Sequence, residues 1–347
     1  MLGSGESLFR DTVALDYDYL PKILPFREKE QRRYAQAIQP LFMDRDGRNL
    51  FVYGAPGIGK TAACKHVLRE LEEETDDIVP LYINCWKHNT TYKILLEICN
   101  LLGMKFVVNK KTPELFALAK KTLNKTRSVM IFDEVDKAEE TDFLYMLLEE
   151  VYKKTIILIT NYKHAIKGLN ERITSRLNAE MLEFFAYNEK ETAGILTNRM
   201  KYAFVPGVWE DDAVALVAKR ASEEEDIRRG LYLMKEAGNI AEEHASKKIM
   251  KAHVEKAIAK TDEFVDKAIE MLDGDTQTIM KVVAENSGAK IGDLYKDYLE
   301  KGGSSSYKTF ARKIEKLRQR SYVKTEKRTD SSGNTTLVSA NRKLTEF

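Results

Sequence analysis

The sequence reads Gly54-Ala55-Pro56-Gly57-Ile58-Gly59-Lys60-Thr61 directly after the apolar run 50–53 and directly before a helix-compatible stretch that begins at Ala62. Glycines let such a loop wrap around a phosphate, while its backbone N–H groups and the following helix N-terminus supply partial positive charge. Lys60 is placed to reach the β- and γ-phosphates, and Thr61 offers a hydroxyl to Mg²⁺. The alternative is a glycine turn that binds nothing. We therefore predict that residues 54–62 bind ATP within an α/β fold with a parallel sheet.

Length and composition narrow the class of protein. The chain has 347 residues, 43% of them hydrophobic and 32% charged, so we expect two or three domains with a sizeable core. No apolar stretch approaches the roughly 18 residues of a membrane helix, and residues 1–10 do not resemble a signal peptide. We expect no membrane partner and a cytoplasmic, nucleoid-associated location. Cys64, Cys85 and Cys99 form no Cys-x-x-Cys pair and are interpreted as buried thiols.

The charge is uneven along the chain. Residues 301–347 hold 12 Lys/Arg against 4 Asp/Glu, a surplus of eight, although the whole chain carries only +2. The first 300 residues are therefore acidic on balance. A basic terminal module suggests a polyanion as partner, and the alternative is a solvated lysine-rich surface.

Two carboxylates end the apolar run 128–132, in the form of a Walker B element. Asp133 can hold Mg²⁺ through its waters, and Glu134 is placed to polarise the water that attacks the γ-phosphate. A further apolar run, 155–160, ends in Asn161, whose amide could orient that water or contact the γ-phosphate. The alternatives are an acidic turn at the end of a strand and a turn-forming asparagine.

Arginines form a third group of candidates. Arg172 and Arg176 lie four residues apart, on one face of a helical turn. Either could be presented to a neighbouring subunit's γ-phosphate as an arginine finger, and we name Arg176 as the catalytic candidate without deciding between them. A local ion pair with Glu171 or Glu180 is the competing interpretation. Residues 183–185 then resemble a last short strand.

Beyond Asn188 the pattern is helical to about residue 262, with a break at 205–207, which predicts a helical lid. Near its middle, Arg228 follows an acidic run at the start of a helix, from which it could reach back to the phosphates. The alternative is a solvated charged face.

The segment before the predicted helix 28–42 holds two prolines that break regular structure. Pro25 and Arg27 lie in it, and a fixed loop here could wall off an adenine. Equally, the segment could pack as an N-terminal arm.

The C-terminal part predicts three amphipathic helices followed by a two-stranded hairpin whose tip lies near 330–334. Together these elements make a winged helix, whose third helix enters the major groove of DNA. That helix is expected to turn Tyr307, Phe310 and Ile314 to the core and a basic side to the DNA. The predicted DNA contacts on the helix and the hairpin are Ser306, Lys308, Thr309, Arg312, Lys316, Lys327 and Arg328.

These features resemble the archaeal replication-initiator family, the ATPases related to both the largest origin-recognition-complex subunit and the cell-division-control helicase loader. The similarity covers almost the whole chain. It is carried by the segments 24–28, 54–61, 82–85, 91–95, 133–134, 175–177 and 226–229, by Asn161 and by the winged helix.

The resemblance implies an AAA+ base (residues 1–186), a helical lid (187–262) and a winged-helix domain (263–347). It also implies that ATP lies between base and lid, with Arg228 as the second sensor, and that an insertion near residues 85–102 touches DNA. One departure stands beside the sensor: the family usually has glycine before the aspartate, and this chain has Glu225.

The leading hypothesis for function is an ATP-dependent initiator that binds duplex origin DNA and helps to recruit and load the replicative helicase, with self-association on the DNA. A nucleotide-switched transcriptional regulator with the same two modules is an alternative. A clamp-loader-like ATPase without sequence preference is another.

Overall fold

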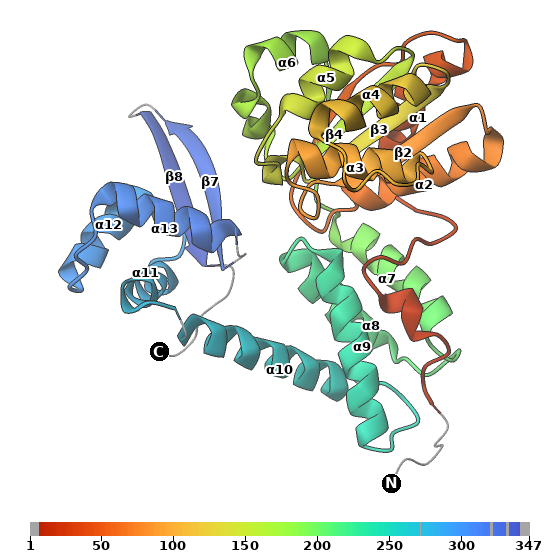
Figure 1. Cartoon of the computed structure of the whole chain (residues 1–347). Coiled ribbons are helices and arrows are strands. Elements are labelled where there is room, and N and C mark those ends of the chain that lie inside the picture. The colour runs from red at the N-terminus through yellow and green to blue at the C-terminus, as the bar shows by residue number, and fades with distance from the viewer. Residues whose placement is uncertain (1–6, 271, 320–321, 331–332, 341–347) are drawn as a thin grey trace. The chain divides into compact units, whose positions relative to one another are not determined.

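The computed structural model describes residues 7–270, 272–319, 322–330 and 333–340. The chain divides into two compact units, residues 1–254 and 255–347 (Figure 1). The first unit holds the expected base and the expected lid as far as residue 254. The domain boundaries after residues 186 and 262 therefore stay predictions. Within the described ranges, no helix has the length and apolar character needed to cross a bilayer.

Five parallel strands form the sheet of the first unit, in the order β2-β3-β4-β1-β5. Their bounds are β1 Leu50–Tyr53, β2 Ile78–Asn84, β3 Arg127–Asp133, β4 Lys154–Thr160 and β5 Glu180–Glu183. The central strands β1, β3 and β4 are almost wholly buried, which is why they read as continuous apolar runs. Their carboxyl ends share one edge of the sheet, so the segments that follow them meet there.

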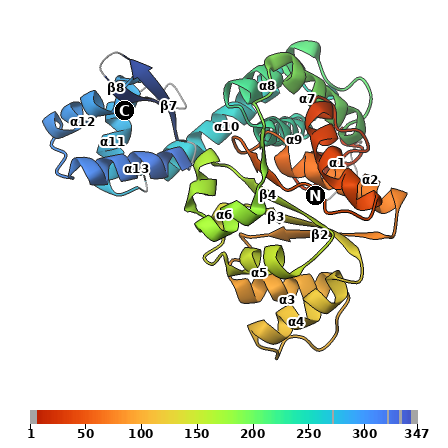
Figure 2. The same ribbon diagram turned by 90° about the horizontal axis from the view of Figure 1, so that it is seen from above.

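Helices cover both faces of this sheet (Figure 2). Along β1, Leu50 and Val52 pack into one core with two helices, whereas Phe51 and Tyr53 pack into the other core. The first core is covered by α1 (Glu28–Phe42) and α2 (Lys60–Glu74), and the second by α3 (Thr91–Leu101), α4 (Thr112–Leu123), α5 (Asp142–Glu150) and α6 (Glu171–Leu177). The three cysteines are free and buried, as expected.

The lid part of the first unit consists of helices, and the N-terminal arm is fastened to it. The helices are α7 (Glu189–Ala203), α8 (Asp211–Glu223), α9 (Ile227–Glu243) and α10 (Lys251–Glu270), which runs past residue 254 into the second unit. The arm includes the short helix η1 (Thr12–Leu15). Buried Arg199 of α7 donates to the carbonyls of Ala14 and Tyr19, at 3.2 and 2.8 Å, and so ties the arm to the lid.

The second unit contains α11 (Gly274–Glu285), α12 (Ile291–Glu300), α13 (Tyr307–Gln319) and an antiparallel sheet. The strands β6 (Ala289–Lys290), β7 (Val323–Asp330) and β8 (Gly333–Ala340) pair in the order β6-β8-β7. Phe310 and Ile314 of α13 lie in the core with residues of α11, α12 and β8. This arrangement of three helices and a hairpin is a winged helix.

Two local expectations are wrong. The last strand of the large sheet is β5, which ends at Glu183, whereas Phe185 lies beyond it with 66% of its surface exposed. Tyr307 is 47% exposed at the first turn of α13, where it packs edge-on against Tyr295 instead of entering the core.

Candidate nucleotide site and nucleic-acid interface

The glycine-rich loop has the backbone that its sequence requires. Gly57 and Gly59 have φ of 75° and 89°, in the left-handed region that favours glycine. A Cβ on Gly57 would lie 2.0 Å from Asp226 Oδ1, so no side chain fits between the loop and the start of α9. The loop leads directly into α2, which begins at Lys60, and so it presents a helix N-terminus as a phosphate-binding loop does.

Lys60 joins the loop to the end of β4. Its Nζ donates to the carbonyl oxygens of Gly54 and Ala55, at 2.8 and 2.6 Å, and to Asn161 Oδ1 at 2.8 Å. Burial lowers the pKa of Lys60 to about 8, although Asp133 opposes this shift. The structure thus brings together the predicted phosphate-binding lysine and the predicted sensor asparagine.

Asp133 and Thr61 meet at the ends of β3 and the loop. Thr61 Oγ1 donates to Asp133 Oδ2 at 2.6 Å, and Tyr82 OH donates to the same oxygen at 2.7 Å. Burial, together with the Asp133 carboxylate, raises the pKa of Tyr82, so its hydroxyl remains a donor. A buried carboxylate beside a threonine hydroxyl is a donor set that suits Mg²⁺. Within the described part of the chain, no group of three or more His, Cys, Asp or Glu could hold a metal ion by itself.

Glu134 follows Asp133 in a left-handed backbone conformation, with φ of 54°. Its N–H donates to Asp133 Oδ1 at 2.9 Å. Burial raises the pKa of Glu134, and the charges of Asp133 and Asp136 raise it further, whereas Lys137 and Arg228 act against them. A carboxylate with a raised pKa suits a general base.

Arg228 is the second residue of α9. The first, Ile227, has an N–H that approaches the carbonyl of Gly57 at 3.4 Å. The Arg228 guanidinium makes a bidentate pair with Asp226, at 3.0 and 2.8 Å, which raises the pKa of Arg228. Asp226 also caps the helix by accepting from the Arg228 N–H at 2.9 Å. The preceding Glu225 has φ of 56°, the conformation for which glycine is the usual residue.

The N-terminal segment reaches the same loop. Buried Arg27 donates to the Ile58 carbonyl from Nε at 3.1 Å and from Nη2 at 2.9 Å, and to the Phe185 carbonyl at 2.6 Å. Its guanidinium lies 3.8 Å from the centroid of the Tyr187 ring. Pro25, two residues earlier, is half-buried. Arg27 therefore supports the loop by bonding its backbone carbonyl at Ile58.

In the second unit, one side of α13 carries the predicted DNA contacts. Ser306, just before the helix, is exposed, as are Lys308, Arg312 and Lys316. Thr309 is half-buried, and its N–H donates to the Ser306 hydroxyl at 3.4 Å. The neighbouring Lys313 points elsewhere and pairs with Asp273 and Asp275, at 2.5 and 2.9 Å. Lys327 and Arg328 lie on β7 opposite Thr336 and Thr335, and their side chains lie outside the described residues.

Known proteins share this combination of modules. A family profile described as a AAA domain matches residues 43–164, and one described as a Cdc6 AAA+ ATPase-type lid domain matches residues 193–259. The ORC1-type DNA replication protein 1 of Sulfurisphaera tokodaii is 35% identical over 267 residues, which are 73% of this chain and 67% of that protein. The ORC1-type DNA replication protein of Pyrococcus furiosus is 31% identical over 319 residues, 84% of this chain and 76% of that protein.

The chain belongs to the ORC1-type DNA replication proteins. It is an AAA+ ATPase that acts in the initiation of DNA replication, and the family predicted from the sequence is confirmed. Among solved structures, the Aeropyrum pernix ORC1 protein in complex with DNA is 28% identical, with a TM-score of 0.68 over 96% of this chain and 94% of that chain. The Aeropyrum pernix ORC2 protein in ADPNP-ADP complexes shares the fold, with 20% identity and a TM-score of 0.73 over 96% and 94% of the two chains.

The two finger candidates of this ORC1-type chain differ in their surroundings. Arg176 Nε pairs with Glu149 Oε2 at 2.5 Å, and its guanidinium lies 5.3 Å from the Tyr145 ring centroid. Its partner is neither Glu171 nor Glu180. Glu180 pairs instead with Arg33 of α1 and with Arg48 in the loop that follows α1. Arg172 is exposed and makes no ion pair within the described ranges.

Three residues of the site escaped sequence reasoning. Tyr82 bonds Asp133, Asp226 holds Arg228, and Tyr187 stacks on Arg27. Asp226 carried a signal, since an aspartate directly before a helix is a common N-cap. Tyr82 and Tyr187 carried none, because each acts through a neighbour far away in the sequence.

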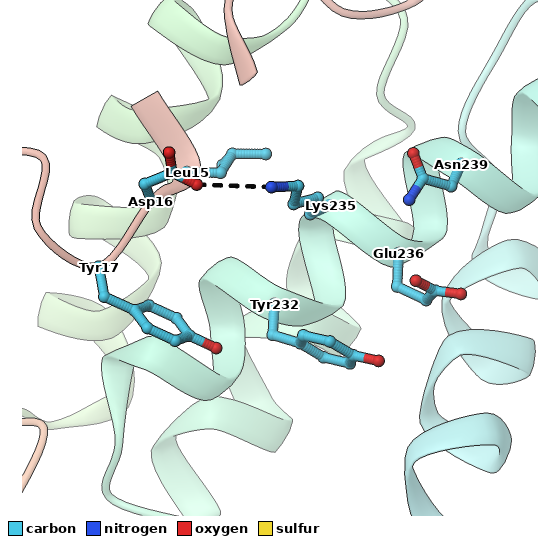
Figure 3. A pocket seen from close by; sticks show the side chains of 7 residues that line it. All are labelled: Leu15, Asp16, Tyr17, Tyr232, Lys235, Glu236 and Asn239. Atoms are coloured by element: carbon cyan, nitrogen blue, oxygen red, sulfur yellow. Dashed lines mark hydrogen bonds and ion pairs between the residues drawn. The ribbon is translucent and has the colours of Figure 1, made fainter. Parts of the chain in front are cut away.

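A pocket of the ORC1-type lid lies between η1 and α9 (Figure 3). It is lined by Leu15, Asp16, Tyr17, Tyr232, Lys235, Glu236 and Asn239. Lys235 pairs with Asp16 across it at 3.4 Å, and so adds a further tie between the arm and the lid.

Proposed function

We propose that the chain is an ATP-switched initiator that binds duplex origin DNA. ATP would lie with its phosphates in the loop 54–61 and at Ala62, against Lys60, with Pro25 and Arg27 walling the site and Arg228 reaching it from the lid. Thr61 and Asp133 would hold Mg²⁺, which neutralises charge on the β- and γ-phosphates when it is bound. The observation that carries this proposal is the contact of Thr61 with Asp133 beside the bond from Lys60 to Asn161.

In the same proposal, Glu134 activates the attacking water and Asn161 positions it. Asn161 is well placed for this role because its amide oxygen already contacts Lys60. Glu134 is suited to it by its raised pKa and by its place next to the metal-binding carboxylate. Arg176 would complete the site of a neighbouring copy on DNA. Hydrolysis would reset the complex.

The DNA part of the proposal rests on the winged helix. The exposed side of α13 offers Lys308, Arg312 and Lys316 in a row, with Thr309 beside them and Ser306 exposed just before the helix. Such a row suits the major groove, while Lys327 and Arg328 at the wing suit the phosphates. A relative, the Aeropyrum pernix ORC1 protein, was solved in complex with DNA. We extend the proposal to nucleoid association and to recruitment of the replicative helicase.

Mapping the chromosomal positions that the protein occupies tests this function. The expected result is a peak at the replication origin for the parent and none for Lys60→Ala, because this substitution removes the positive charge that binds the phosphates of ATP. A matched control is Lys125→Ala, at an exposed position after α4. Occupancy spread over promoters would favour the transcriptional regulator instead, and occupancy without sequence preference would favour the clamp-loader-like ATPase.

A further inference from the structure

Three side chains gather just beyond the carboxyl ends of neighbouring strands, next to the nucleotide site and not part of it. Trp86 follows β2 by two residues, Lys137 follows β3 by four, and Tyr162 follows β4 by two. Because β2, β3 and β4 are adjacent and parallel, these segments leave the sheet at the same edge. We call Trp86, Lys137 and Tyr162 the edge cluster.

Lys137 holds the edge cluster together. Its ammonium lies 5.3 Å from the Trp86 ring centroid and 5.9 Å from that of Tyr162, within the range of cation–π attraction. Tyr162 in turn lies beside His164, with ring centroids 5.5 Å apart. Trp86 nevertheless keeps 64% of its surface exposed. An ordered, exposed indole beside a cation is a surface on which a flat ring can stack.

Charges of both signs face the solvent around the cluster, but its two exposed carboxylates have partners: Glu139 accepts from Asn89 Nδ2 at 2.5 Å, and Glu140 accepts from the Thr91 N–H at 3.0 Å. The exposed cations Lys87 and Lys163 directly follow Trp86 and Tyr162 in the sequence, and His164 is exposed two residues after Tyr162. Asp136, the carboxylate that pairs with Lys137 at 3.1 Å, has only 10% of its side chain exposed and also accepts from Thr160 Oγ1 at 2.8 Å. Because the charge of Asp136 is already paired, it does not repel an anionic chain that approaches the rings.

Aromatic faces flanked by lysines distinguish between two forms of DNA. A duplex hides the faces of its bases and offers only its edges and phosphates, whereas an unpaired strand offers every base for stacking. The geometry points to the edge cluster as a binding site for single-stranded DNA, with bases on Trp86 and Tyr162 and phosphates on the flanking lysines. This inference rests on the proposed function in that it takes DNA to be the nucleic acid that the protein meets.

The position of the cluster couples it to the nucleotide. Tyr162 is next to Asn161, and Lys137 is three residues after Glu134, so a strand stacked here would contact the segments that carry both predicted catalytic groups. By linkage, a strand that binds the ATP form more tightly must strengthen ATP binding by the same factor.

The chain provides its own reporter, because it has only two tryptophans. Trp209 packs edge-on against Phe204 within the lid, so Trp209→Phe leaves Trp86 as the single fluorophore. Titration with oligothymidylate of about 16 nucleotides should quench that emission. An equal concentration of duplex should leave it unchanged. Should Trp209→Phe fail to fold, the difference between the parent and Trp86→Phe reports the same signal.

Variants assign the site. Trp86→Ala and Tyr162→Ala should each weaken binding of the strand by roughly 10-fold or more, and Trp86→Phe should keep most of it. Tyr152→Ala is the matched control, since Tyr152 is also 64% exposed but precedes β4, at the opposite edge of the sheet. Tyr162→Ala and Tyr152→Ala should bind duplex origin DNA as the parent does. Arg312→Ala should lose the duplex and keep the strand, which separates a failure of this inference from a failure of the proposed function.

Three outcomes would overturn the inference. Quenching by duplex as strong as by the strand would show a general DNA surface. Unchanged strand affinity in both Trp86→Ala and Tyr162→Ala would place strand binding elsewhere. If Trp86→Ala instead lowered self-association in sedimentation and left strand binding intact, the edge cluster would be a protein interface.

Discussion

Lys60 illustrates how a single buried charge ties nucleotide binding to pH. Burial lowers its pKa to about 8 in the free protein, and bound phosphates must raise it again because they favour the ammonium. Above about pH 8, binding therefore takes up a proton. We expect the dissociation constant for ATP to rise about tenfold per pH unit there, and to change little below it. Equilibrium titrations across this range measure the effect. Arginine stays charged across this range, so the dissociation constant of Lys60→Arg for ATP should not rise with pH.

The Walker residues should separate binding from chemistry. Lys60→Ala should weaken ATP binding sharply, because it removes the positive charge that binds the β- and γ-phosphates. Glu134→Gln should spare binding and slow hydrolysis, since the amide keeps the shape but cannot act as the base. A nucleotide titration and a turnover assay on both variants decide this. Hydrolysis by Glu134→Gln at the parent rate would show that another group activates the water.

Glu225 has a strained backbone, as its place in the sequence predicted: it stands where the family usually has glycine. Its φ of 56° lies where an L-residue costs about 1–2 kcal/mol relative to the right-handed region, and glycine escapes most of that cost. Glu225→Gly should raise the free energy of unfolding by up to about 1 kcal/mol, after the greater backbone freedom of glycine in the unfolded chain is allowed for. Denaturant unfolding measures the change. Glu225→Ala keeps a Cβ and is the control, and equal stability of the two variants would show that the backbone is unstrained.

At the scale of elements, α13 should divide base reading from phosphate binding. A recognition helix commonly reads bases from its N-terminal part, and Arg312 has a planar fork that can pair with guanine O6 and N7. Arg312→Ala should therefore cost about 1–3 kcal/mol on origin duplex and much less on a scrambled one. Arg328→Ala, at the wing, should weaken both duplexes alike and flatten the salt dependence. Binding curves at several salt concentrations measure both. Equal loss on both duplexes for Arg312→Ala would leave the winged helix a non-specific clamp.

The orientation of α13 depends on a polar network that its own sequence does not reveal. Asp275 of α11 accepts from Tyr298 and from Ser305, which lies just before α13, and pairs with Lys313 on it. Burial opposes the charge of Asp275, yet the bonds from Tyr298, Lys313 and Ser305 prevail and lower its pKa.

Asp275→Asn should accordingly reduce the affinity for both duplexes, because it loosens the start of α13 while leaving every proposed DNA contact in place. Its unfolding midpoint should fall as well. Asp293→Asn is a matched control, since Asp293 lies in the first turn of the neighbouring helix α12 and is exposed. Unchanged duplex affinity in Asp275→Asn would show that the network does not position the helix.

Elements with a strong pattern were predictable, and those set by tertiary context were not. Helix α1 and strands β3 and β4 lie within one residue of expectation, because their apolar spacing is fixed by burial on one face or on both. β5 was misplaced because it is an edge strand, where Glu180 and Glu183 replace the apolar run and Phe184 and Phe185 mimic one. The two residues of β6 carry no pattern at all; pairing with β8 makes them a strand.

For the whole molecule, the candidate site is assembled from segments that the sequence keeps far apart. Lys60 meets Asn161 across 101 positions, and Arg27 meets Phe185 across 158. The motif residues could be predicted because strand ends of a parallel sheet converge at one edge. The supports could not, since Tyr82, Tyr187 and Asp226 act through neighbours that only the folded chain supplies. The partner of Arg176 could not be predicted either. It is Glu149, and not Glu171 or Glu180, because α6 packs on α5.

Assembly of several copies on DNA should change the rate at which each chain hydrolyses ATP. If Arg176 reaches the γ-phosphate of a neighbouring copy, turnover per chain must rise with protein concentration on origin DNA, because each site is then completed in trans. Its pair with Glu149 is half-exposed and contributes less than about 1 kcal/mol, so that a neighbour's phosphate can displace it. Arg176→Ala should abolish the rise in turnover while leaving ATP and duplex affinity unchanged, and Glu149→Ala should steepen it. Arg172→Ala is the matched control, one helical turn away on α6. Loss of the rise in Arg172→Ala alone would transfer the finger to Arg172, and a turnover that never depends on concentration would show that each chain hydrolyses ATP by itself.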